Sequence, residues 1–213
     1  MWLSQIPQQI PDHFLGSFST GAVRAAFDRQ SAQDWETFLS LRAAELRPGG
    51  RLVVALPSLA DDGSTGFAQL MNPANAALSE LERTGVITPE ERGRMTLAAY
   101  PRRQADLLAP FARDGQFRRL VVEHCSSAVA PDTAWADYES DKDAEALSRR
   151  RASFFRAVFA PSLAQALAPG RSEKEHEAFA TQLEAELRRR LMGNPSRIDH
   201  LVGMIALAKQ GAE

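Results

Sequence analysis

A short unbroken apolar run, Leu52 to Leu56, constrains this chain's fold more than any other segment. It reads LVVAL, is rich in β-branched residues and is closed by Pro57. Without polar alternation, such a run predicts a strand buried on both faces, which is typical of parallel sheets. Two further segments predict strands, Phe117 to Cys125 and Arg197 to Lys209. Three strands make a thin sheet for 213 residues.

Helices are predicted around these strands. Two of them have a capping box at the start, Thr88 with Glu91 and Ser172 with Glu175. Asp132 to Tyr138 is predicted to be irregular. The other predicted helices are Thr20 to Leu46, a helix after the Asp61–Ser64 loop that ends near Arg83, Pro101 to Arg113, and a long helix from Asp141 to Leu167, bent at Pro161. This order indicates an α/β protein whose helices cover a mostly parallel sheet.

Composition excludes several classes of function. Lys+Arg at 25 nearly balance Asp+Glu at 27, so a nucleic-acid partner is not expected. One cysteine, Cys125, excludes an internal disulfide and a zinc site built on cysteines. Apolar runs fall far short of the ~20 residues of a membrane span, and the first residues do not resemble a signal peptide. We therefore expect a cytoplasmic protein with no membrane partner.

Catalytic and metal motifs are missing from the sequence. The histidines do not pair at helical spacing, so we expect no bound metal. Ser126 and Ser127 lack the glycines of a nucleophile elbow, and we assign no catalytic residue. Gly49 and Gly50 precede a predicted strand, which is typical of a turn and not of a glycine-rich phosphate-binding loop. Two arginine clusters, 149–151 and 188–190, are interpreted as solvated helix faces.

Two aromatic features leave a choice open. Trp2 carries an indole N–H, a donor suited to fixing a carboxylate or carbonyl in an apolar pocket. Phe154, Phe155, Val158 and Phe159 form a dense apolar stripe. The stripe is compatible with a core and equally with the wall of a ligand pocket.

Several segments, in the same order along the chain, resemble the SABATH family of carboxyl and N-methyltransferases. The first is WLSQIP at residues 2–7, and the second is the helix with Asp34-Trp35 and Phe38-Leu39 that ends in Pro48-Gly49-Gly50. The others are LVVALP, the segment from Ser64 to Ile87 that ends in Gly85-Val86-Ile87, Tyr100-Pro101, Gly115-Gln116-Phe117, and Phe155 to Pro161.

The resemblance covers nearly the whole chain but only the C-terminal part of the family. Members hold S-adenosylmethionine with a glycine-containing turn and an acidic residue, and nothing here matches either. The resemblance implies a partial class I (Rossmann-like) methyltransferase sheet that lacks its N-terminal strands, with a large α-helical cap. Residues 1–60, 101–130 and 196–213 would form the remnant α/β core, and 61–100 and 131–195 the substrate-binding cap. An internal start, a truncation and a separately made half remain alternatives.

The resemblance also implies a substrate site. Trp2 would hold the substrate carboxylate. Leu70 and Met71, Phe155 and Val158, and His200 would line the acceptor pocket. Met71 stands where members often have tryptophan, which alters the width of the pocket.

Two functional hypotheses follow. In the first, the chain is the substrate-binding part of an S-adenosylmethionine-dependent methyltransferase that esterifies a small carboxylic acid, and the isolated chain does not bind the cofactor. In the second, it is a non-catalytic module that binds a small acid or a protein through the same cap. An incomplete sheet exposes a strand edge, so we expect a homodimer or higher assembly.

Overall fold

The chain folds around a four-stranded sheet, shown in a computed structural model that describes residues 3–211. The strand order is β1-β4-β3-β2, and every neighbouring pair is antiparallel. The strands are β1 (Arg51–Pro57), β2 (Gln116–Phe117), β3 (Leu120–Val129) and β4 (Leu201–Lys209). The mixed α/β class is confirmed, but the expectation of a mostly parallel sheet is wrong for the strands described.

The apolar run in β1 is buried on one face only. Exposed residues alternate with half-buried ones, and Val53 is 63% exposed. Leu52, Val54 and Leu56 face an apolar cluster on one side of the sheet, while Val53 faces the opposite side and is not covered. Since β4 lies between β1 and β3 and runs opposite to both, β1 is also an edge strand among residues 3–211. An unbroken apolar sequence does not reveal how many faces of its strand are covered.

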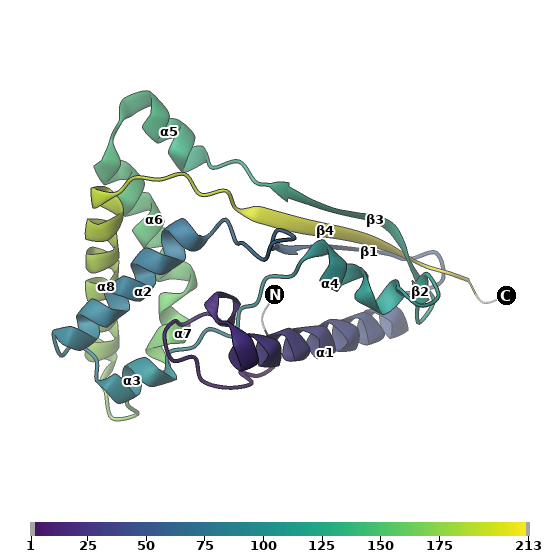
Figure 1. Cartoon of the computed structure of the whole chain (residues 1–213), viewed down its shortest axis with the longest axis horizontal. Coiled ribbons are helices and arrows are strands. Elements are labelled where there is room, and N and C mark those ends of the chain that lie inside the picture. The colour runs from purple at the N-terminus through teal and green to yellow at the C-terminus, as the bar shows by residue number, and fades with distance from the viewer. Residues whose placement is uncertain (1–2, 212–213) are drawn as a thin grey trace.

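One face of the sheet packs on α1 (Gly21–Glu45), a helix that confirms the prediction for Thr20 to Leu46. Figure 1 shows α1 running beneath the strands, with α4 (Gln104–Leu108) beside it. Trp35 and Leu39 of α1 share a buried apolar cluster with Ile205 of β4. The Trp35 indole N–H donates to the backbone oxygen of Leu107 at 3.0 Å, which attaches α1 to α4.

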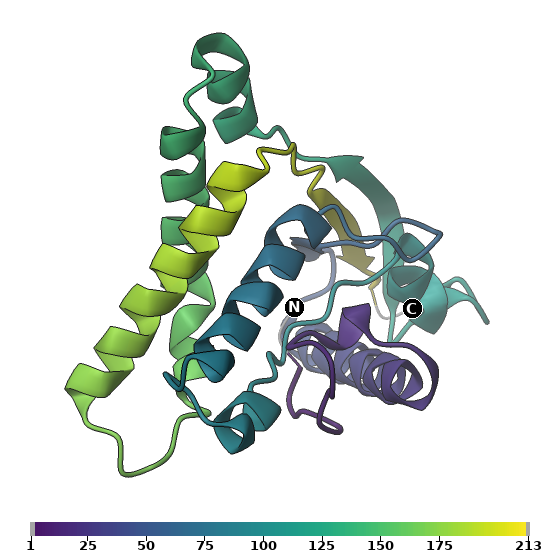
Figure 2. The ribbon, with the colours of Figure 1, turned by 60° about the vertical axis from the view of Figure 1, so that its left-hand side comes forward.

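Three helices pack side by side at the other end of the molecule (Figures 1 and 2). They are α2 (Ala68–Arg83), α6 (Ala144–Val158) and α8 (Glu173–Gly193). Their facing sides form a second buried cluster that includes Leu78, Phe155 and Leu187. The short helices α3 (Pro89–Arg94) and α7 (Ala160–Ala164) complete this layer. Sheet and helical layer therefore each have an apolar core.

Local details differ from the predictions in three places. The segment expected to be irregular contains α5 (Thr133–Asp141), which Asp132 caps by accepting a hydrogen bond from the backbone N–H of Trp135. The long predicted helix is divided into α6 and α7, because Pro161 lies in the first turn of a new helix, where proline is well tolerated. The predicted helix from Pro101 to Arg113 consists of α4 and a 3₁₀ turn, η2 (Ala109–Phe111). A 3₁₀ turn, η1 (Gly16–Phe18), also precedes α1.

Both predicted capping boxes are confirmed. In each, the side chain of Thr88 or Ser172 accepts from the backbone three residues on, and the glutamate there bonds back. Along the described chain, no helix combines the length and the apolar character needed to cross a membrane.

Candidate functional site

A small apolar cavity lies where β1 ends, against the start of α2. Its volume is about 100 Å³, and we call it the inner hollow. Its walls include Phe18, Ser58, Met71, Tyr100 and Phe159. It therefore collects residues from the sheet, the helical layer and the loops between them.

Two polar groups in the walls of the inner hollow, the hydroxyls of Ser58 and Tyr100, are already hydrogen-bonded within the chain. The Ser58 hydroxyl donates to the backbone oxygen of Arg102 at 2.7 Å. The Tyr100 hydroxyl donates to the Asp28 carboxylate at 2.5 Å. Burial, together with the hydrogen bond to Asp28, raises the pKa of Tyr100. Tyr100 therefore stays protonated at neutral pH, and these two groups are suited to holding the wall in shape rather than to moving protons.

A second cavity, of about 280 Å³, also has Phe67 in its wall and is called the outer hollow. Leu70, Phe154 and His200 form part of its wall. The His200 ring meets the Phe67 ring edge-on at 4.2 Å between centroids. Burial lowers the pKa of His200, so its imidazole is neutral at pH 7.

A buried ion pair forms the polar side of the outer hollow. Arg151 donates to the Asp132 carboxylate at 2.6 Å and also to the backbone oxygen of Ser196. The same carboxylate accepts from the backbone N–H of Ile198 at 3.0 Å. Burial lowers the pKa of Arg151, while the nearby Asp132 opposes that shift. This network joins α6 to the start of α5 and to the segment that leads into β4.

The predicted substrate residues are distributed around both hollows. Met71 lines the inner hollow, while Leu70 and His200 line the outer one. Phe155 is buried behind them and packs against Phe14 and Phe159.

Phe155 and Val158 are not among the walls of either hollow. Val158 is 41% exposed at the end of α6. Trp2 lies outside the described residues. The assignment of these side chains to substrate remains a prediction.

Sequence reasoning did not single out Phe67 or Ser58. Phe67 borders both hollows, and Ser58 follows the last residue of β1. The one available signal was position, since each residue lies just outside a predicted strand or at the start of a predicted helix. Neither belongs to a motif that carries chemistry by itself.

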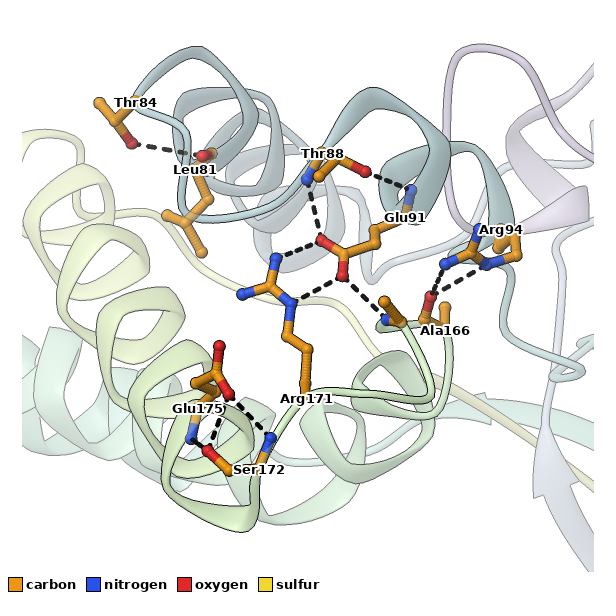
Figure 3. Close-up of polar contacts among 10 residues, drawn as sticks. Leu81, Thr84, Thr88, Glu91, Arg94, Ala166, Arg171, Ser172 and Glu175 are labelled. Carbon is orange, nitrogen blue, oxygen red and sulfur yellow. Dashed lines mark hydrogen bonds and ion pairs between the residues drawn. The ribbon is translucent and has the colours of Figure 1, made fainter.

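The most buried carboxylate lies away from both hollows. Glu91 of α3 is 1% exposed and accepts from the backbone N–H groups of Thr88 and Ala168 at 2.9 and 2.8 Å (Figure 3). It also binds the Arg171 guanidinium through two contacts of 2.7 and 2.5 Å. Mainly because of Arg171, the pKa of Glu91 is lowered to about 2. This cluster fastens α3 to the turn before α8 and is structural.

Comparison with known proteins places this architecture in a family. The profile of the family described as SAM dependent carboxyl methyltransferase matches residues 1–209. The chain belongs to this family. The resemblance found in the sequence motifs is confirmed.

Individual relatives agree with that assignment. Salicylate carboxymethyltransferase of Clarkia breweri is 26% identical over 149 residues, which cover 67% of this chain and 40% of the relative. Gibberellic acid methyltransferase 2 of Arabidopsis thaliana is 25% identical over 195 residues, covering 84% and 49%. The chain thus spans half or less of the length of these curated relatives.

A solved structure shares the fold. The structure "Loganic acid methyltransferase with SAH" is similar with a TM-score of 0.71 at 21% identity. The similarity covers 99% of this chain and 59% of that one. The described strands and helices therefore match part of a methyltransferase fold.

The glycines near the hollows do not form a cofactor cradle. A Cβ on Gly66 would lie 1.5 Å from the backbone oxygen of Asp199, so packing between two chain segments explains this glycine. Gly63 has a positive φ of 81° in a turn where Asp62 accepts from the backbone N–H of Ser64. Residues 3–211 also contain no group of three or more histidine, cysteine or acidic residues able to hold a metal ion. Gly63 and Gly66 are thus explained by a turn and by close packing of two segments.

Proposed function

We propose that this chain forms the acceptor-binding part of an S-adenosylmethionine-dependent methyltransferase that converts a small carboxylic acid into its methyl ester. The observation that carries the proposal is the inner hollow, an apolar cavity at the end of β1 in a chain whose family match extends over residues 1–209. The names of the relatives support the acid, since salicylate and gibberellic acid both carry a carboxyl group.

The proposed contribution of this chain is positioning. A carboxylate is already ionised at neutral pH and needs no strong base to act as a nucleophile. Fixing its orientation in a near-attack geometry is then a large part of the catalytic task. Apolar walls hold the body of the acid and exclude water, and the proposed role of Trp2 is to donate its indole N–H to the carboxylate. The methyl group would come from S-adenosylmethionine.

The proposal includes a partial Rossmann-like sheet and a division into core and cap. Residues 1–60, 101–130 and 196–213 would be the core, and 61–100 and 131–195 the cap. Of the three apolar clusters among residues 3–211, the one at the sheet lies within the proposed core and the one among the helices lies mostly within the proposed cap, which supports this division.

Cofactor binding tests one part of the proposal. We propose that the chain by itself does not bind S-adenosylmethionine, which is supported by the structural roles of Gly63 and Gly66, and calorimetric titration of the chain with this cofactor should give no measurable heat of binding. Stoichiometric binding would contradict this part of the proposal.

Acid binding tests the other part. Benzoate should bind the full chain in a saturation-transfer NMR experiment. Ala99 lines the inner hollow, and the larger side chain of Ala99→Phe would occupy it, lowering benzoate affinity by about tenfold or more. Ala105→Phe on the exposed side of α4 is the matched control and should leave the affinity unchanged. Equal affinities in all three proteins would refute the inner hollow as the acid site.

The second candidate is a non-catalytic module that binds a small acid or a protein. The exposed edge and outer face of β1, with Val53 63% exposed, favour it because an open strand edge can pair with another chain. The same feature leads us to propose a homodimer. Sedimentation velocity should show a dimer, and a single monomeric species would argue against this pairing.

A further inference from the structure

One aromatic residue, Phe67, borders both hollows. Phe67 contributes to the wall of the inner hollow and to the wall of the outer hollow. It immediately precedes α2, and its backbone N–H donates to the Thr65 hydroxyl oxygen at 3.2 Å. Its backbone oxygen accepts from the N–H groups of Leu70 and Met71, each at 2.9 Å. The backbone that carries the Phe67 ring is thus held on both sides.

A second chain segment supports the ring from behind. His200 packs edge-on against it, with ring planes at 70°. The backbones next to these two residues are in contact, because Gly66 leaves no room for a Cβ against the oxygen of Asp199. Close backbone packing therefore sets the place where the Phe67 and His200 rings meet.

The size of the inner hollow makes this partition important. At about 100 Å³ it is smaller than the roughly 300–1,000 Å³ typical of small-molecule sites. The outer hollow, which shares Phe67 with it, has a volume of about 280 Å³. The side chains that it offers include Leu70 and Phe154, of which Phe154 is 45% exposed. A longer apolar ligand would find apolar surface there if the Phe67 ring were absent.

We propose that Phe67, supported by His200, determines the length of the carboxylic acid that the chain accepts. With the ring in place, a short or single-ring acid occupies the inner hollow. Without it the two hollows join, and an acid with an alkyl extension reaches the outer hollow. This inference rests on the proposed acid-binding function of the inner hollow.

The test compares benzoate with 4-butylbenzoate on the full chain by NMR titration. The unmodified chain should prefer benzoate by about tenfold or more, since a wall that excludes even one methylene discriminates to that extent. Phe67→Ala should bring the two affinities to within about threefold, and Phe67→Leu should give an intermediate ratio. Phe154→Ala, which removes an aromatic ring from the outer hollow only, is the matched control and should keep the original preference.

Neutral ligands separate this inference from the proposed function. Toluene and butylbenzene probe the same space without requiring recognition of a carboxylate. If the unmodified chain binds neither acid, the proposed function fails. The comparison of toluene with butylbenzene then decides by itself whether Phe67 limits the length of the ligand. A gain of butylbenzene binding in Phe67→Ala supports the partition. No gain, or the same gain in Phe154→Ala, overturns it.

Discussion

The buried Glu91 carboxylate allows a quantitative prediction for the substitution Glu91→Gln. Its pKa of about 2, against an ordinary value of 4.5, means that folding favours the charged form. At about 1.4 kcal/mol for each tenfold change in proton affinity, that preference corresponds to about 3 kcal/mol at pH 7. Glutamine keeps the shape of the side chain but loses its charge. Its amide NH₂ group would also face the N–H donors of Thr88, Ala168 and Arg171, which now have a carboxylate oxygen as acceptor. We expect the free energy of unfolding to fall by about 3 kcal/mol.

Urea unfolding of the full chain at pH 7 measures this difference, with an unchanged m-value as the sign of a simple loss of stability. The exposed neighbour Glu90 provides the control, and Glu90→Gln should unfold close to the unmodified chain. The contribution of Glu91 is complete above its unfolded-state pKa and is lost as the pH falls from about 4.5 towards 2. The gap between the unmodified chain and Glu91→Gln should therefore narrow over that range. A gap independent of pH, or one no larger than that of Glu90→Gln, would refute the reasoning.

Three further substitutions test the packing. Burial lowers the pKa of His13 from 6.5 to about 4, so the folded chain disfavours the charged imidazole. The free energy of unfolding should therefore decrease as the pH falls from 6.5 towards 4. In unfolding curves measured at pH 7 and 4.5, His13→Asn should reduce that decrease. Trp35→Phe leaves a buried carbonyl without its donor and should cost about 1–3 kcal/mol in urea unfolding, more than Trp135→Phe on α5. Gly66→Ala must displace a facing backbone oxygen and should cost about 1–3 kcal/mol, whereas Gly93→Ala, with open space around it, should not lower the melting temperature.

The sequence predicted best those features that depend on neighbouring residues. Both capping boxes were predictable because the cap and its glutamate are three residues apart and need no other partner. The cap of α5 by Asp132 follows the same logic, yet the short polar segment after it concealed the helix. That miss was avoidable from the sequence.

The direction of the sheet could not be predicted in this way. Whether β1 has a parallel or an antiparallel neighbour depends on β4, which is distant in sequence. The apolar run of β1 is equally compatible with either arrangement. The same limit applies to the site: Leu70 and Met71 are consecutive residues of α2 and line different hollows, whose walls come from segments distant in sequence.

The position of β4 has a consequence for how the chain folds during synthesis. This strand forms hydrogen bonds with both β1 and β3, and most of the described helices precede it in sequence. Until β4 has been made, β1 and β3 have no strand between them and present unpaired backbone groups. The helical layer also waits for a late segment, because α2 packs against α8, which ends shortly before β4. Sheet and helical layer therefore both close only once the last part of the described chain has been made, and until then the edges of β1 and β3 are open to pairing with other strands.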